Sequence, residues 1–139
     1  MTGFAAVLMY LLIMIGLVLS YALPRVPQVL TGKNRPDAWG RDKPSIDPAL
    51  LVRAQHAHAN AVENFPLFLG VVVIGALMGQ SATAIDPLAG YVVYLRLGQA
   101  TMHLIGTSFW LVMARATLFL SQLALIGVMI WRLFHPVAG

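Results

Sequence analysis

Four polar side chains that could hold a small molecule fall at helical spacing in an otherwise apolar stretch of the chain. They are Arg53, His56, Asn60 and Glu63. At about 100° per residue they share one sector of a helix, roughly 80° wide. A cation, an imidazole, an amide and a carboxylate on one stripe could bind a ligand with charges of both signs. These residues are therefore candidates for a binding site.

A second apolar stretch repeats the pattern with Arg96, Gln99 and His103. With Arg96 at zero, Gln99 lies near about 300° and His103 near about 340° on a helical projection. Ionisable residues inside apolar helices are costly, which makes them functional candidates. Two such stripes would most simply face each other, or a neighbouring subunit, around one polar site.

The composition places the helices that carry these residues in a bilayer. The 139-residue chain is 59% hydrophobic and only 10% charged, whereas about a quarter of the residues in a soluble domain are charged. Each membrane span needs roughly 20 apolar residues. We therefore predict an all-α membrane protein, a single four-helix domain over residues 1–139, with spans at about 4–23, 49–78, 86–109 and 111–134. The second span is expected to begin near Asp47 and Pro48, with Asp47 as its cap and the proline at the first helical position.

Basic residues predict how these spans are oriented. Six of the nine Lys and Arg residues lie in or beside the first connection, namely Arg25, Lys33, Arg35, Arg41, Lys43 and Arg53. Short loops rich in such residues stay in the cytoplasm. We expect this connection and the junction near Arg115 in the cytoplasm, with both termini outside it. No basic face of the kind that binds nucleic acid is left over.

Several of the polar residues also have ordinary structural explanations. Arg53 could anchor a helix at the membrane surface, Asn60 and Glu63 could hydrogen-bond between helices, and His103 alone could be a packing residue. The mixture of residue types on one stripe is harder to explain in this way, because helix association does not require it.

The sequence also limits the chemistry. With zero cysteines, a thiolate metal site and a cysteine nucleophile are excluded, so any thiol must arrive with a substrate. His58 lies on the other side of the helix from His56, so the pair is no metal clamp and we predict no metal site. His56 and His103, on separate helices, leave open a bundle that ligates haem.

Residues 53–69, RAQHAHANAVENFPLFL, resemble the second-helix signature of the MAPEG family, the membrane-associated proteins in eicosanoid and glutathione metabolism. Residues 40–44, GRDKP, resemble the loop before that helix in the bacterial branch. In layout the resemblance covers essentially the whole chain. It implies a left-handed four-helix bundle assembled as a homotrimer, and it suggests a bacterial inner membrane as the location.

The resemblance further implies that glutathione is a co-substrate held in a cytoplasm-facing cleft between subunits. Asn60 and Glu63 match the residues that bind the tripeptide in the family, and Arg53 and Arg96 match motif arginines. The arginine that activates the thiol corresponds to Arg115.

Three positions depart from the family pattern. His56 replaces a glutathione-binding arginine, and Gln99 and His103 replace tyrosines that contact glutathione. We retain all three as candidate glutathione-binding residues.

Together these inferences predict a glutathione-dependent transferase or peroxidase that acts on lipophilic electrophiles or lipid hydroperoxides. Its expected partners are further copies of the chain, membrane lipid and a small lipophilic substrate, with no nucleic acid. A protein of the MAPEG fold that binds or scaffolds without catalysis is the main alternative, and a haem-binding bundle is the second.

Overall fold

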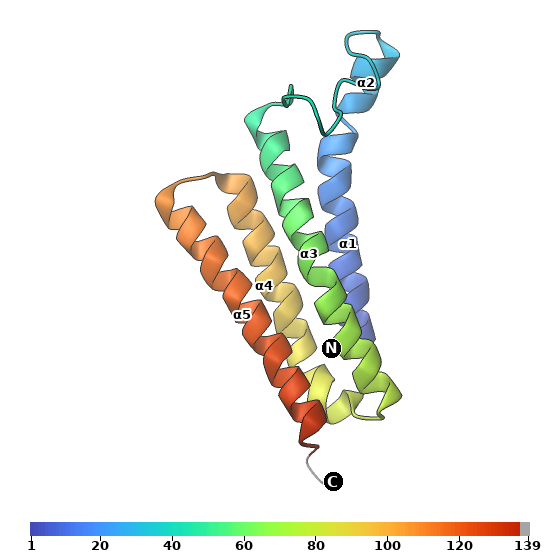
Figure 1. Cartoon of the computed structure of the whole chain (residues 1–139), viewed down its shortest axis with the longest axis vertical. Helices are drawn as coiled ribbons and strands as arrows, with labels where there is room; N and C mark the ends of the chain where they lie inside the picture. The colour runs from blue at the N-terminus through green and yellow to red at the C-terminus, as the bar shows by residue number, and fades with distance from the viewer. Residues whose placement is uncertain (137–139) are drawn as a thin grey trace.

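The computed structural model describes residues 1–136 and is built entirely from helices (Figure 1). No strand occurs among these residues, which confirms the predicted all-α fold. In chain order the elements are α1 (Gly3–Ala22), α2 (Arg25–Leu30), α3 (Ala49–Leu77), the short π-helix η1 (Ser81–Ile85), α4 (Asp86–Ile105) and α5 (Phe109–Phe134).

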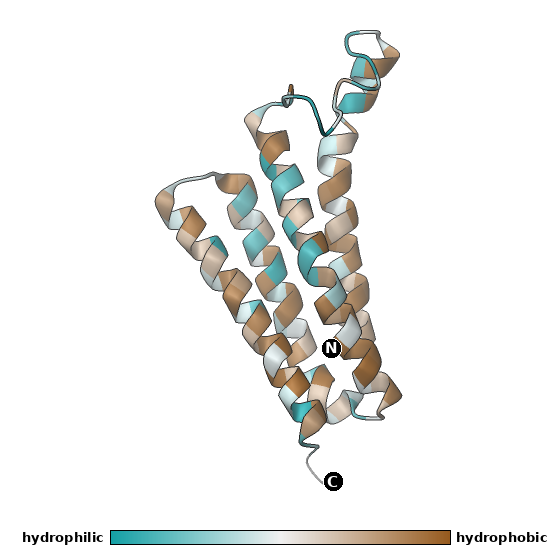
Figure 2. Ribbon diagram, in the orientation of Figure 1, coloured by the Kyte–Doolittle hydropathy of each residue, from teal (hydrophilic) through white to brown (hydrophobic). Residues whose placement is uncertain are grey.

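Three segments are long and apolar enough to cross a membrane: Gly3–Leu30, Ala49–Leu77 and Phe109–Phe134. The remaining long helix, α4, has 20 residues but is not among them, because it carries the polar residues of the second stripe. It packs against α1, α3 and α5, so it is the central helix of the bundle. Figure 2 shows apolar residues along α1 and α5, whereas hydrophilic residues gather on the upper halves of α3 and α4.

Both termini lie at one end of the bundle (Figure 1). The first connection and the α4–α5 connection lie at the other end, and α2 projects beyond the bundle there. This arrangement agrees with a topology in which the two connections share one side of a membrane. Which side is cytoplasmic stays a prediction.

Arg25 holds the first connection in place through contacts with three side chains. Its guanidinium lies over the rings of Tyr21 and Trp39, with centroid distances of 5.3 and 5.2 Å, and it pairs with the Asp47 carboxylate at 2.5 Å. The other Asp47 oxygen accepts a hydrogen bond from Trp39 Nε1 at 2.9 Å. We expected Asp47 to cap the second long helix. It does not, because both of its oxygens are already engaged, and α3 begins after Pro48 with no side-chain cap.

The α4–α5 junction also differs from its expected place. We expected the third span to reach residue 109, but α4 ends at Ile105, where Gly106 takes an extended conformation. Ser108 then starts α5 at Phe109, because its hydroxyl accepts a hydrogen bond from the Leu111 amide at 3.4 Å. A serine cap of this kind satisfies one of the free amides at a helix start.

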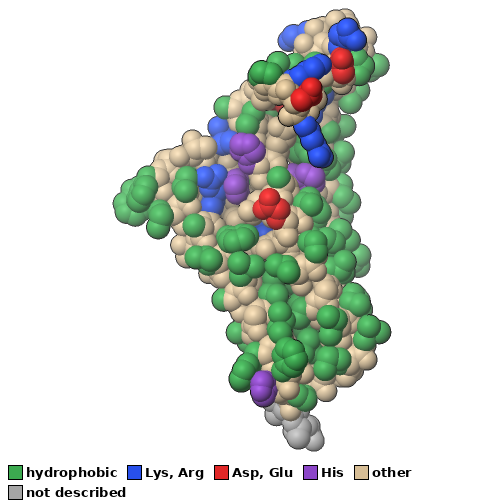
Figure 3. Space-filling model, viewed as in Figure 1, with side chains coloured by type: hydrophobic (Ala, Val, Ile, Leu, Met, Phe, Trp, Pro, Cys, Tyr) green, Lys and Arg blue, Asp and Glu red, His purple; other side chains and the backbone are tan. Residues whose placement is uncertain are grey.

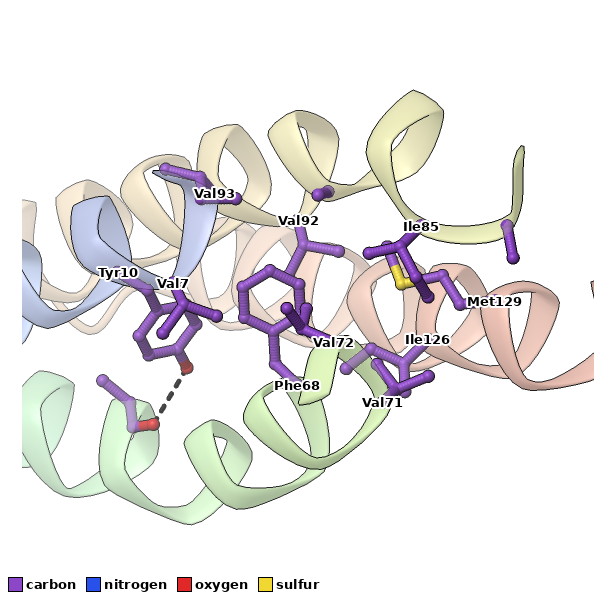
Figure 4. Close-up of a cluster of buried hydrophobic side chains, with 14 of the residues drawn as sticks. Val7, Tyr10, Phe68, Val71, Val72, Ile85, Val92, Val93, Ile126 and Met129 are labelled. Carbon is purple, nitrogen blue, oxygen red and sulfur yellow. Dashed lines mark hydrogen bonds between the residues drawn. The ribbon is translucent and has the colours of Figure 1, made fainter. Parts of the chain in front are cut away.

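The core is a continuous apolar cluster between the helices (Figure 4). Phe68, Ile85 and Met129 are fully buried and come from α3, η1 and α5. The Tyr10 hydroxyl donates a hydrogen bond to the carbonyl of Ala61 at 2.9 Å, drawn as a dashed line in Figure 4. This bond fastens α1 to α3 because a carbonyl inside a helix can accept a second donor.

The closest packing occurs where α3 meets η1. A Cβ atom added at Gly75 would lie 2.5 Å from Cγ1 of Ile85 and 3.6 Å from Cδ2 of Leu133. Because Ile85 is fully buried, its side chain has little room to move away.

Replacing Gly75 by alanine should therefore destabilise the protein by about 1–3 kcal/mol, the usual cost of overpacking a core. Gly70→Ala, on the same helix, is the matched control, because no atom of the described residues lies within 4 Å of its added Cβ. Thermal unfolding in detergent should give a lower midpoint for Gly75→Ala only. Equal midpoints for the two variants would show that α3 and η1 are not packed this closely.

Candidate functional site

The candidate residues lie in the half of the bundle that is nearer the first connection and the α4–α5 connection. In this half, hydrophilic residues run along α3 and α4 (Figure 2). The space-filling view shows histidine, Lys and Arg side chains gathered here, above one acidic side chain that borders apolar ones (Figure 3). The polar site is therefore part of the helices and is not confined to the connections.

The two polar stripes face each other through Arg96 and Asn60. Arg96 Nη1 donates a hydrogen bond to Asn60 Oδ1 at 2.7 Å, and its guanidinium carbon lies 5.3 Å from the centre of the Tyr10 ring. Arg96 is only 1% exposed. Its Nε and Nη2 atoms are buried and have no hydrogen-bond partner among the described residues. One edge of the guanidinium thus retains unused donors.

Arg53 joins α3 to α4 at the end of the bundle where the α4–α5 connection lies. Its Nε donates a hydrogen bond to the carbonyl of Leu104 at 3.0 Å. Leu104 lies in the last turn of α4, where carbonyls have no partner within the helix. Arg53 therefore stabilises the end of α4 through this bond.

Gln99 points to α5. Its Oε1 accepts a hydrogen bond from Gln122 Nε2 at 2.8 Å, and the two side chains are 2% and 0% exposed. We did not single out Gln122 from the sequence. The signal that could have found it is its position seven residues after Arg115, which places both on one face of the fourth long helix.

Arg115 meets the second stripe from α5. Its Nη1 and the Nδ1 atom of His103 are 3.0 Å apart. His103 lies in the last turn of α4, so this contact joins the ends of α4 and α5 beside their short connection. The structure thus brings Arg115 to the same site as Arg96 and His103.

His56 and Glu63 lie on the outer face of α3, where both are exposed. Exposed apolar residues, Val62 and Leu67, flank Glu63. A carboxylate on an apolar helix face is costly in a bilayer.

His58 belongs to a different contact. Its Nδ1 lies 3.0 Å from the Tyr21 hydroxyl, between α1 and α3. This places it away from His56, as the helical projection indicated. No group of three or more His, Asp or Glu residues in the part of the chain that the structure describes is arranged to hold a metal ion.

The arginines of the site form no ion pair among the residues that the structure describes. Among residues 1–136, ion pairs occur only in the first connection, between Arg25 and Asp47 and from Asp37 to Arg35 and Lys43. Three arginines of the polar site, Arg53, Arg96 and Arg115, have no carboxylate of these residues within ion-pair distance. The site can therefore attract an anion, and a guanidinium can stabilise a developing negative charge.

Fold and site define an integral membrane protein: a bundle of four long helices with a basic polar site between its central helix and its neighbours. The chain belongs to the MAPEG family, because the model described as MAPEG family matches residues 2–135, nearly the whole chain. This confirms the family resemblance found in the second-helix segment. Comparisons with curated proteins and with solved structures returned no match.

Replacing Asn60 by leucine should destabilise the protein by about 1.5–3 kcal/mol, because the hydrogen bond to a buried charge is lost. Asn64→Leu is the matched control one turn along α3: Asn64 is also buried, but its Nδ2 has no partner among the described residues, so its replacement should cost less. Denaturant unfolding of the detergent-solubilised protein measures both. A loss at Asn64 as large as that at Asn60 would contradict a stabilising Asn60–Arg96 bond.

Proposed function

We propose that this protein is a glutathione-dependent transferase or peroxidase acting on lipophilic electrophiles or lipid hydroperoxides. The observation that carries the proposal is the set of arginines without carboxylate partners on the facing helices of a MAPEG-family bundle. The family is associated with glutathione, and glutathione is an anion at neutral pH.

The chemistry of the tripeptide matches the residues of the site. Glutathione carries two carboxylates, an ammonium group and a thiol. Arg53 and Arg96 supply donors for carboxylates, and the free edge of Arg96 suits a planar acceptor. Glu63 supplies an acceptor for the ammonium group, and Asn60 adds an amide. His56, exposed beside these residues on α3, provides a further hydrogen-bonding group.

Arg115 is the residue that we assign to the sulfur. A free thiol has a pKa of about 8.5, so only a few per cent is ionised at neutral pH. Each unit by which the pKa falls requires about 1.4 kcal/mol of preferential stabilisation of the thiolate. A guanidinium without a carboxylate partner can supply this. The thiolate then forms a bond to the electrophilic carbon as the leaving group departs with the bonding electrons. With a hydroperoxide it attacks the terminal oxygen and the O–O bond breaks, so that the alkoxide takes a proton from water and leaves as the alcohol. The sulfenic acid formed on glutathione reacts with a second glutathione to give the disulfide and water.

The proposed assembly is a homotrimer that encloses glutathione between subunits near the cytoplasmic face. It is supported by the positions of Glu63 and His56, which a single chain leaves on an outward apolar face. The lipophilic substrate would enter laterally from the bilayer, and a bacterial inner membrane is the proposed location.

Titration calorimetry of the detergent-solubilised protein with glutathione tests the binding site. The wild type should bind, and Glu63→Gln should weaken binding by about tenfold to a hundredfold, because the ammonium group then meets a neutral acceptor in place of a carboxylate. Asp42→Asn, in the first connection, is the control with the same loss of charge and should bind as the wild type does. Failure of the wild type to bind glutathione would end the proposal.

Activity assays separate the enzyme from its main alternative. Turnover of a chlorinated aromatic electrophile or of a lipid hydroperoxide would support the transferase or peroxidase. Glutathione binding without turnover of either substrate would favour a binding or scaffold protein of the same fold.

Native mass spectrometry tests the assembly. The mass released from mild detergent should be that of three chains, and the trimer should dissociate more readily in Glu63→Leu if this carboxylate contributes to the shared site. Val62→Leu, at the preceding exposed position, is the control. A wild-type monomer that still binds glutathione would rule out a site between subunits.

A further inference from the structure

His103 and Arg115 form a contact that the proposed catalytic role of Arg115 does not explain. The distance of 3.0 Å joins Arg115 Nη1 to His103 Nδ1. A guanidinium has donors only, so the imidazole nitrogen must be the acceptor. Nδ1 therefore carries no proton, and His103 is in its neutral form with the proton on Nε2.

Two arginines lie next to His103. Arg115 contacts its ring, and Arg53 donates a hydrogen bond to the carbonyl of the next residue, Leu104. No carboxylate among the described residues pairs with Arg115. The contact with His103 is thus the one polar side-chain contact that the described structure provides for this guanidinium.

A neutral acceptor differs from a carboxylate in its electrostatic effect. Most buried or half-buried arginines pair with carboxylates, which orient the guanidinium but also cancel its charge. An imidazole nitrogen orients the group through one hydrogen bond and leaves its full positive charge available. For a residue that has to stabilise a thiolate, the second arrangement is the more effective one.

We infer that His103 is a positioning residue that holds Arg115 toward the glutathione sulfur as a neutral hydrogen-bond acceptor. The inference rests on the proposed function and adds a role for one residue of the same site. The geometry turns the ring of His103 to Arg115, so His103 acts through the arginine.

Three substitutions of His103 separate orientation from charge. His103→Gln retains a neutral acceptor, His103→Phe retains a ring without an acceptor, and His103→Glu retains an acceptor but neutralises Arg115. The measured quantity is the pKa of the bound glutathione thiol, from the ultraviolet absorbance of the thiolate against pH. His135→Phe, at the other end of the bundle and stacked on Trp131, is the control.

The expected thiol pKa is near that of the wild type in His103→Gln and His135→Phe. In His103→Phe and His103→Glu the thiol pKa should rise by about one unit, so the ratio of thiolate to thiol at a given pH falls about tenfold. The dissociation constant of glutathione should change by less than about threefold throughout, because His103 does not bind the tripeptide itself. A large increase in that constant with an unchanged thiol pKa would overturn the inference and make His103 a ligand-binding residue.

A second measurement needs no glutathione. Nitrogen-15 NMR of the trimer or monomer in detergent should show an unprotonated, hydrogen-bonded Nδ1 in His103, with a shift that changes in Arg115→Met. If the shift is the same with and without Arg115, the contact does not exist and the inference fails. If the contact is present but the wild type binds no glutathione, the proposed function fails, and with it the role assigned to this pair.

Discussion

Arg96 carries a guanidinium into the interior of a bundle that lies in a membrane, and a charge of this kind cannot face hydrocarbon without a large cost in free energy. The arrangement of the helices meets this constraint. Because α4 bears Arg96, Gln99 and His103, it lies in the middle of the bundle, in contact with α1, α3 and α5. Asn60 and the ring of Tyr10 then provide the polar and aromatic surroundings of the guanidinium. The strongly apolar helices α1 and α5 lie on the two sides of α3 and α4 (Figure 2).

Charged side chains have two kinds of partner in this structure. In the first connection, arginine and lysine side chains pair with carboxylates of the same connection, and Arg25 also lies over two aromatic rings. Around α4, the arginines are held by neutral acceptors: an amide, a backbone carbonyl and an imidazole. Hydrogen bonds to neutral groups orient an arginine and leave its charge available for an anion. The first arrangement stabilises the fold, and the second is suited to a site.

Helical periodicity in the sequence was sufficient to predict the long helices and the sides on which their polar residues lie. The two polar stripes were expected to face each other or a neighbouring subunit. Asn60 and Arg96 face each other, because a stripe in an apolar helix has few places where it can be buried. The partner of Gln99 was missed, since a single amide on an apolar helix, such as Gln122, does not reveal which neighbour it meets. Asp47 was misassigned because a local capping rule competes with an ion pair to Arg25, 22 positions away in the chain. In the proposed trimer, the roles of the site residues toward a ligand would depend on subunit contacts, which the pattern of a single chain does not contain.

The low apolarity of α4 also bears on how the chain enters its membrane. An arginine at the centre of a span costs about 2.5–3.5 kcal/mol on scales of helix insertion, so α4 is a poor candidate to partition into lipid alone. Its connection to α5 is only the stretch 106–108, and the buried amides Gln99 and Gln122 bond across the pair. Insertion of α4 and α5 as one hairpin would let the strongly apolar α5 offset this cost. The polar residues of the proposed binding site would then make the insertion of α4 depend on α5, the last helix of the chain.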